Sequence, residues 1–272
     1  MNKKIKLNVA LTVDFDAVSG FMGLGLTDPY IMSIGKLGAD EGICRIVKTL
    51  KNNNVSCTFF IPSHTAENYT DKCKMIIDAG FEIGHHGYAH EITKGKTIKE
   101  ERSYIEKGLI ALDKYLNVRP VGYRSPCLSQ TQTTYKLLSE YGFKYDSSES
   151  AKDKPYFLEL GGNPRLVEIP IKLLNCDTTY YHSFSPGNYS NLPTSPSVCE
   201  EIWKKEFEGL YESDEENLCY VHTVHPFCTG SYFYRMKVYD SFISSMKSHA
   251  DVNFVTMQEL CDIFLTNANV IT

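Results

Sequence analysis

The stretch AGFEIGHHGYAHE, residues 79–91, places a short apolar segment between a helix end and a cluster of histidines. Residues 65–79 follow a helical pattern that Gly80 ends. Residues 81–84 are typical of a buried strand, and three of the chain's eight histidines follow within residues 84–91. A helix that leads into a buried strand is typical of a parallel sheet. The stretch therefore predicts an α/β fold with a polar site at a strand end.

The same alternation of strand and helix runs along the whole chain. Apolar runs rich in Val, Ile and Phe predict seven strands, at residues 7–13, 57–61, 81–84, 121–123, 166–169, 218–221 and 253–255. Helical patterns follow most of them, at residues 41–51, 65–79, 97–116, 131–141, 198–211, 236–248 and 257–265. This alternation favours a (β/α) barrel or a distorted version of one, with a doubly wound open sheet as the alternative.

The segment 97–116 shows the clearest helical pattern, and Thr97 with Glu100 predicts a capping box at its start. Two long connections interrupt the alternation. The first, residues 20–38, contains five glycines and could fold over a site, and the second, residues 147–196, is typical of a functional insertion or loop. We find no internal repeat or linker and expect a single domain over residues 1–272.

Charge and cysteine content exclude several classes of protein. The 272 residues include 28 Lys and Arg against 33 Asp and Glu, a net charge of −5, which gives no reason to expect nucleic acid or an anionic membrane as a partner. Nine scattered cysteines without a CxxC motif predict reduced, mostly buried thiols. The apolar run at residues 7–13 is too short for a signal peptide or a membrane span, so we expect a cytoplasmic protein.

Two carboxylates follow the first expected strand. Asp14 and Asp16 are two residues apart, so both side chains point to the same side of the strand. Their mutual repulsion raises the pKa of one of them unless a cation lies beside them. An Asp turn that caps a helix is the simpler interpretation of this motif alone.

The histidine cluster predicts a metal site. His86 and His90 are four residues apart, so one helical turn would bring both imidazoles to one face. With Asp16 they would form a set of two histidines and one carboxylate that leaves coordination positions open for water and substrate. An isolated pair of this spacing is more often surface decoration, but the preceding buried strand and the flanking glycines favour the metal.

Two further strand ends carry candidate residues. Arg124, before Pro126, places a cation at the rim of the same sheet end, either in the site or in an ordinary salt bridge. His225, before Pro226, is a second source of histidine there and would complete an acid–base pair with an aspartate. Packing alone is the alternative interpretation of His225.

These segments, in this order, resemble the NodB-homology polysaccharide deacetylases, carbohydrate esterase family four. The likeness is greatest to an intracellular subgroup with peptidoglycan deacetylase-like proteins and relatives of allantoinases and cyclic imidases. The motifs that carry it are NVALTVDFDAV (8–18), AGFEIGHHGYAHE (79–91), GYRSP (122–126), GFKYDSS (142–148) and VHTVHPF (221–227). The resemblance implies a distorted (β/α)7 barrel with one divalent metal in a groove at the strand carboxyl ends.

The resemblance also implies a role for each candidate residue. Zn²⁺ is the expected metal, with Co, Fe, Ni and Mn as alternatives, and its ligands would be Asp16, His86 and His90. Asp14 would be the general base, Arg124 would orient it and lower its pKa, and His225 would be the general acid. Two features depart from the family's pattern. Phe15 separates two aspartates that are usually adjacent, and His85 stands where a small residue is common, so it could be an alternative metal ligand or a supporting residue. Asp177 and Glu168 are both candidates for the family's fourth motif.

The sequence therefore predicts a metal-dependent hydrolase of non-peptide C–N bonds, with N-deacetylation of an acetylated amino sugar as the named case. The substrate would be a small-molecule or oligosaccharide amide, and the resemblance allows for a homo-tetramer. A metal-independent hydrolase of cyclic amides, of the allantoinase type, is a close alternative. From other classes, a phosphatase with Asp14 as nucleophile and a catalytically silent sugar-binding protein remain open.

Overall fold

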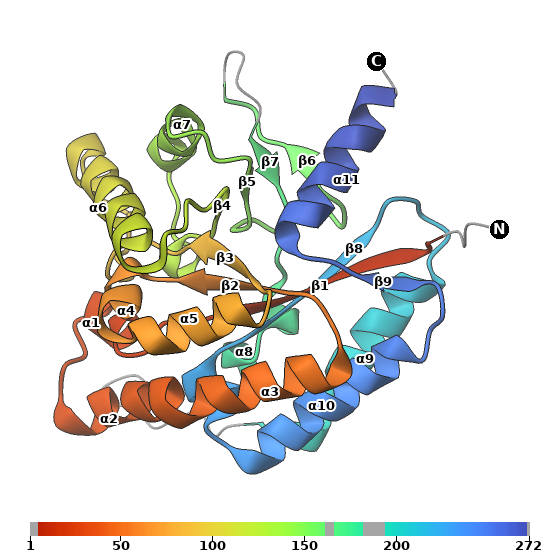
Figure 1. Cartoon of the computed structure of the whole chain (residues 1–272). Helices are drawn as coiled ribbons and strands as arrows, with labels where there is room; N and C mark the ends of the chain where they lie inside the picture. The colour runs from red at the N-terminus through yellow and green to blue at the C-terminus, as the bar shows by residue number, and fades with distance from the viewer. Residues whose placement is uncertain (1–4, 161–165, 182–193, 271–272) are drawn as a thin grey trace.

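The computed structural model describes residues 5–160, 166–181 and 194–270. Within these residues nine strands form one sheet (Figure 1). The strands are β1 (Leu7–Asp14), β2 (Cys57–Ile61), β3 (Glu82–His85), β4 (Gly122–Tyr123), β5 (Tyr145–Asp146), β6 (Tyr156–Phe157), β7 (Val167–Glu168), β8 (Cys219–Val224) and β9 (Val252–Phe254).

The strand order is that of a barrel. Hydrogen bonds connect the strands as β6-β7-β5-β4-β3-β2-β1-β8, and β9 also pairs with β1. All pairs are parallel except β6 with β7. From β1 to β5 neighbours in the chain are neighbours in space, and β8 returns to the free side of β1. An isolated parallel bridge between Cys176 and Thr223 adds the segment after β7 to β8. The result is the curled sheet of a distorted barrel, not the doubly wound alternative.

Helices cover the outside of this sheet. Figure 1 shows α3 and α10 side by side along one face, with α9 beyond them and α4, α5 and α6 next to β2 and β3. The helices are α1 (Ser19–Gly23), α2 (Pro29–Leu37), α3 (Ile43–Asn53), α4 (Ser63–Asn68), α5 (Thr70–Asp78), α6 (Ile98–Leu116), α7 (Gln132–Glu140), α8 (Thr178–Tyr181), α9 (Pro196–Glu212), α10 (Phe233–Lys247) and α11 (Met257–Val270). None of the described helices is long and apolar enough to cross a bilayer.

The alternation of side chains along β1 separates two cores. Val9, Leu11 and Val13 point outward and pack against the covering helices in the main hydrophobic cluster. Ala10 points inward, into a second cluster with Met257 of α11. Because α11 contributes to this inner cluster at one end of the sheet, polar side chains are left to gather at the other end.

All seven expected strands are present, and β2 has the expected bounds. Strands β5 and β6, of two residues each, were not expected. The capping box of α6 is confirmed: the Thr97 amide donates to Glu100 Oε2 at 2.8 Å. All nine cysteines are free and seven are buried, as expected.

The single helix expected at residues 65–79 is wrong. The chain forms α4 and α5, separated at Tyr69 (φ −130°, ψ 41°). Asn68 Nδ2 donates to the His64 carbonyl oxygen at 2.7 Å, and Thr70 Oγ1 donates to the Ala66 carbonyl oxygen at 2.7 Å. Polar side chains that bind nearby carbonyl groups compete with the helical hydrogen bonds, which accounts for the break.

The glycine-rich connection at residues 20–38 is largely helical. Asp28 caps α2 by accepting from the Ile31 amide at 3.2 Å, and Pro29 occupies the first helical position. A π-helical turn, Gly38–Gly42, then leads directly into α3. The expected irregular stretch 147–196 contains β6, β7 and α8, while its residues 161–165 and 182–193 lie outside the described residues.

Two helical glycines give a matched test of the packing. An added Cβ at Gly108 of α6 would lie 2.1 Å from His85 Nε2, whereas at Gly209 of α9 it meets nothing within 4 Å. We expect Gly108→Ala to lower the free energy of unfolding by about 1 to 3 kcal/mol. Gly209→Ala should raise it by up to about 1 kcal/mol, because alanine favours the helix. Urea denaturation measures both, and equal effects would contradict this packing.

Candidate functional site

Two aspartates end the central strand at a shared cavity. Asp14 is the last residue of β1, and Asp14 and Asp16 both line a cavity of about 220 Å³. Phe15 between them points the opposite way and is fully buried in the main core. The carboxylates therefore share one side, as the spacing predicts.

The first histidine pair joins Asp16 at this cavity. His86 Nε2 lies 3.5 Å from Asp16 Oδ1, and His90 Nε2 lies 3.8 Å from Asp16 Oδ2. One ligand atom from each of the three residues lies within 4.8 Å of the others, and all three side chains are buried. The structure thus brings together Asp16, His86 and His90, the three residues predicted to bind the metal.

The donor set fits a divalent ion. Two ligand atoms of a tetrahedral zinc site lie roughly 3.4 Å apart, close to the two distances above. Asp16 Oδ1 is buried and accepts no hydrogen bond within the described residues. Burial raises the pKa of Asp16 to about 8, which disfavours its carboxylate form in the protein alone. A cation beside Asp16 would satisfy the oxygen and favour the ionised form.

The histidines are held in the form that binds metal. His86 Nδ1 donates to the Arg124 carbonyl oxygen at 2.7 Å, which leaves the Nε2 lone pair directed toward Asp16. Burial lowers the pKa of His86 to about 4 and that of His90 well below its usual range. Both imidazoles are therefore neutral at pH 7, as metal ligands must be.

Helix α1, in the glycine-rich connection, packs against Asp16 and His90. A Cβ at Gly20 would lie 2.9 Å from Asp16 Cβ, and one at Gly23 would lie 2.0 Å from the His90 carbonyl oxygen. The backbone of α1 approaches both residues so closely that only glycine fits. Thr65 Oγ1 also donates to the Asp16 carbonyl oxygen at 2.8 Å.

Arg124 is fully buried and pairs with Asp14. Its Nη1 donates to Asp14 Oδ1 at 2.8 Å, to Thr12 Oγ1 at 2.9 Å and to Thr223 Oγ1 at 3.3 Å. Its Nη2 donates to Ser147 Oγ at 2.9 Å. Burial favours the protonated form of Asp14, but Arg124 together with His86 and His225 outweighs burial, and the pKa of Asp14 is lowered. Asp14 is therefore an ionised carboxylate beside a protonatable Asp16.

His225 lies across the cavity and is held by Asp177. Its Nδ1 lies 2.7 Å from Asp177 Oδ1, and Asp177 Oδ2 accepts from the His225 amide at 2.8 Å and from Thr229 Oγ1 at 2.7 Å. His225 Nε2 points toward the first strand, 3.7 Å from Asp14 Oδ2. Burial disfavours the imidazolium, but Asp177, with a smaller contribution from Cys176, outweighs burial and the pKa of His225 is raised well above its usual range.

Of the two candidates for the fourth motif, only Asp177 reaches the site. Glu168 Oε1 accepts from the amides of Ser148 and Glu149 at 2.9 and 2.8 Å, and the carboxyl group is buried beside Asp146. It holds a loop, not a histidine.

His85 is a structural residue. Its Nε2 lies 3.3 Å from the Ile105 carbonyl oxygen, its Nδ1 accepts from the Gly87 amide at 3.1 Å, and its ring stacks on Tyr123. It faces α6, away from the cavity, so the alternative of a metal ligand is wrong. Its bond to Gly87 fixes the turn that leads to His90.

The supporting hydroxyls were missed by sequence reasoning. Thr12 and Thr223 contact the Arg124 guanidinium from β1 and β8, and Ser147 contacts it from the segment after β5. Threonine and serine are common at strand ends, so only the inward-facing position of Thr12, two residues before Asp14, could have indicated this role.

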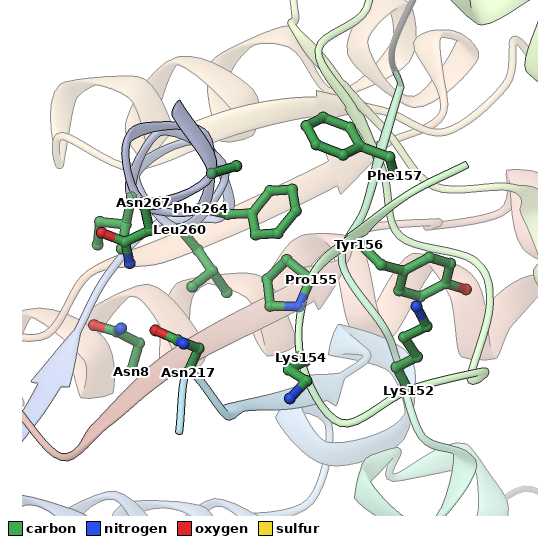
Figure 2. A pocket seen from close by; sticks show the side chains of 12 residues that line it. Asn8, Lys152, Lys154, Pro155, Tyr156, Phe157, Asn217, Leu260, Phe264 and Asn267 are labelled. Carbon is green, nitrogen blue, oxygen red and sulfur yellow. The ribbon is translucent and has the colours of Figure 1, made fainter. Parts of the chain in front are cut away.

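A second cavity lies at the other end of the sheet. It measures about 500 Å³, and Figure 2 shows Tyr156, Phe157, Leu260 and Phe264 among the side chains that line it. Asn8, near the start of β1, also lines it, at the opposite end of the strand from the aspartates. None of its lining residues is His, Cys, Asp or Glu, so the acid–base groups belong to the smaller cavity.

Comparisons with known proteins agree with this arrangement. Residues 35–145 match the polysaccharide deacetylase family model. The chain is 29% identical to a peptidoglycan deacetylase from Helicobacter pylori, over 94% of this chain and 96% of that protein. A structure of a Mycobacterium smegmatis protein assigned to the polysaccharide deacetylases is 31% identical, with a TM-score of 0.90 over 98% of this chain and 93% of that one. An allantoinase structure shares the fold at 20% identity, with a TM-score of 0.84 over 96% and 91% of the two chains.

The matched family region contains β2, β3 and β4, and with them His86, His90 and Arg124. The similarity to the Mycobacterium smegmatis protein extends over nearly the whole of both chains and so includes the ends of β1 and β8. The chain therefore belongs to the polysaccharide deacetylase family, whose members are hydrolases that act on carbon–nitrogen bonds other than peptide bonds.

Proposed function

We propose that this protein is a metal-dependent amide hydrolase that removes the acetyl group from an acetylated amino sugar or a related amide. One observation carries the proposal: a buried metal-binding set, an ionised aspartate and a histidine with a raised pKa surround a single cavity. Hydrolysis of an amide needs an activated water, a base and an acid, and each has a candidate here.

Asp16, His86 and His90 would hold the metal. Zn²⁺ suits two neutral imidazoles and one carboxylate, and Co, Fe, Ni or Mn could replace it. When bound there, the ion would polarise the acetyl carbonyl group and lower the pKa of a bound water.

Asp14 is the proposed base. Arg124 occupies its Oδ1, so Oδ2 remains to accept the proton of the attacking water. Because Arg124 lowers the pKa of Asp14, the carboxylate stays ionised well below neutral pH. The same contact fixes the direction of the carboxylate, since the guanidinium is itself held by Thr12 and Ser147.

His225 is the proposed acid. An amine anion is a very poor leaving group, so the nitrogen must receive a proton as the C–N bond breaks. Asp177 holds Nδ1 and stabilises the imidazolium, which leaves the Nε2 proton directed into the cavity. Asp14 and His225 would therefore have opposite roles. Asp14 accepts the proton of water, and His225 donates a proton to the departing amine.

The cavity suits a small acetylated group. It is about 220 Å³, and apolar side chains line it beside the polar set: Phe21, Leu24, Leu128, Ile171, Leu173 and Phe227. Such a wall accommodates a methyl group and the apolar face of a sugar ring.

We expect the purified protein, loaded with Zn²⁺, to release acetate from N-acetylated chitooligosaccharides. Removal of the ion with a chelator should abolish release, and added Zn²⁺ or Co²⁺ should restore it, because the ion activates the water. Acetate release measured by a coupled assay tests this expectation.

Hydrolysis of cyclic imides or allantoin that persists in chelator would instead support the metal-independent alternative. Phosphate release from a generic ester that is lost in Asp14→Asn would support the phosphatase. Tight binding of oligosaccharide without any turnover by the metal-loaded protein would support the sugar-binding alternative.

His86→Ala should remove the metal and leave the fold intact. Loss of one of three protein ligands should weaken metal affinity by at least about 100-fold, since even the loss of a supporting partner costs 10 to 100-fold. His249→Ala is the matched control, because His249 packs against Phe207 and Tyr211 and does not line the cavity. Metal content and thermal unfolding of both variants give the answer, and a normal metal content in His86→Ala would refute the ligand set.

Asp177→Asn should shift the pH dependence of kcat/KM. Asp177 raises the pKa of His225, so loss of its charge lowers that pKa and His225 loses its proton at a lower pH. The alkaline limb of the profile should therefore move to lower pH. His225→Ala is the comparison: it should retain metal and slow turnover by ~10² to 10⁴-fold. An unchanged alkaline limb in Asp177→Asn would exclude His225 as the acid.

A further inference from the structure

A second group of metal-binding side chains lies beside the proposed catalytic site. Cys176, Asp177 and His225 each offer one ligand atom, and these atoms lie within 4.8 Å of one another. All three are nearly enclosed, with exposed fractions of 6%, 0% and 9%. Cys176 and His225 also line the site cavity, so a small ion can reach them from it.

The backbone holds this cluster in place. Cys176 forms the isolated parallel bridge to Thr223 of β8, and the Asp177 amide donates to the Thr223 carbonyl oxygen at 3.1 Å. Asp177 Oδ2 is anchored by the His225 amide and by Thr229 Oγ1. The three side chains therefore come from two segments that a sheet pairing aligns.

The three donors suit a thiophilic ion. A thiolate, an imidazole nitrogen and a carboxylate oxygen together favour Zn²⁺ or Co²⁺ over Mg²⁺ or Ca²⁺. Thr178 Oγ1 lies 3.0 Å from Cys176 Sγ and would remain to hydrogen-bond the thiolate. No other cysteine takes part in a metal-binding group of the described residues, and the set of Asp16, His86 and His90 contains no sulfur.

Binding here must open a short contact. His225 Nδ1 lies 2.7 Å from Asp177 Oδ1, whereas the two ligand atoms of a tetrahedral zinc site lie roughly 3.4 Å apart. The ion would separate these atoms and displace the protons from Nδ1 and from the thiol, which leave to solvent. Because the group gives up an existing hydrogen bond, its affinity is lower than that of the first set, whose atoms are already 3.5 and 3.8 Å apart.

We propose that Cys176, Asp177 and His225 form a second, weaker metal site, and that an ion bound there inhibits the enzyme by occupying His225. The binding part stands on this cluster alone, whereas the inhibitory part rests on the proposed function, in which His225 donates the proton. Excess zinc would then leave the first ion in place and replace the His225 imidazolium by a metal-bound neutral imidazole, whose Nε2 proton is a much weaker acid.

A cobalt titration of the metal-free, fully reduced protein tests the binding part. A thiolate that binds Co²⁺ gives a charge-transfer absorption in the near ultraviolet, which histidine and carboxylate ligands do not give. We expect this absorption to be absent up to one equivalent of Co²⁺ and to grow as the second equivalent binds. Cys176→Ser should lose it, while Cys127→Ser, which changes the exposed cysteine that lines the same cavity, should keep it.

No thiolate absorption at several equivalents, or an absorption that Cys176→Ser retains, would overturn the second site. Absorption that begins with the first equivalent would support a metal site at Cys176 but contradict its lower affinity relative to the set of Asp16, His86 and His90. The titration uses no substrate, so its result does not depend on whether the protein is a deacetylase.

Inhibition is measured within each variant as the ratio of activity in excess Zn²⁺ to activity at one equivalent. We expect Cys176→Ser to need at least about tenfold more Zn²⁺ for half inhibition, because it has lost one ligand. Equal inhibition of Cys176→Ser and the unsubstituted protein would refute the inhibitory role.

Discussion

Two buried carboxylates, Asp14 and Asp16, line one small cavity, a third, Asp177, lies behind His225, and each needs its own positive charge. Asp14 has the Arg124 guanidinium, and Asp177 has the His225 imidazolium. Asp16 has two neutral imidazoles beside it, and the His225 imidazolium, whose Nε2 lies 4.0 Å away, is already paired with Asp177. Burial therefore still raises the pKa of Asp16 to about 8. Like charges this close cannot all remain ionised in a protein interior unless cations compensate them. A divalent ion at Asp16 completes this balance, and the proposed chemistry depends on it.

The same balance explains why Arg124 is at the centre of the fold. Its guanidinium is fully buried, lies over the Phe60 ring at 4.2 Å and donates to groups that belong to or follow β1, β5 and β8. One side chain thereby connects strands that are far apart in the sequence across the inside of the curled sheet. Its carbonyl oxygen also accepts a hydrogen bond from His86 Nδ1, so one residue orients both the proposed base and a proposed metal ligand.

Much of the site could be predicted because the ends of buried strands can be recognised from the amino-acid sequence. Asp14, Asp16, His86 and His225 each follow a run of apolar residues, and the carboxyl ends of parallel strands meet at one edge. That rule brings remote residues together without knowledge of the strand order. It could not distinguish Asp177 from Glu168, because both lie in a stretch with little periodic pattern, and only the bridge of Cys176 to β8 places Asp177 at His225.

Other parts of the fold were not predictable for identifiable reasons. Local competition by Asn68 and Thr70 divided an expected helix. The glycines of residues 20–38 indicated a loop, yet Gly20 and Gly23 are needed because α1 packs directly on Asp16 and His90. A high glycine content is typical both of loops and of places where a backbone packs closely against another segment. Only the tertiary structure distinguishes the two cases. The role of His85 was open for the same reason, since its partner Ile105 belongs to a remote helix.

Anomalous scattering from crystals of the zinc-loaded protein tests the central claim most directly. Data collected on the two sides of the zinc absorption edge locate the ion without assumptions about the protein. At one equivalent of Zn²⁺ we expect a single strong peak within bonding distance of Asp16, His86 Nε2 and His90 Nε2. A peak that lacks any of these three neighbours, or no peak in protein that retains its metal, would contradict it.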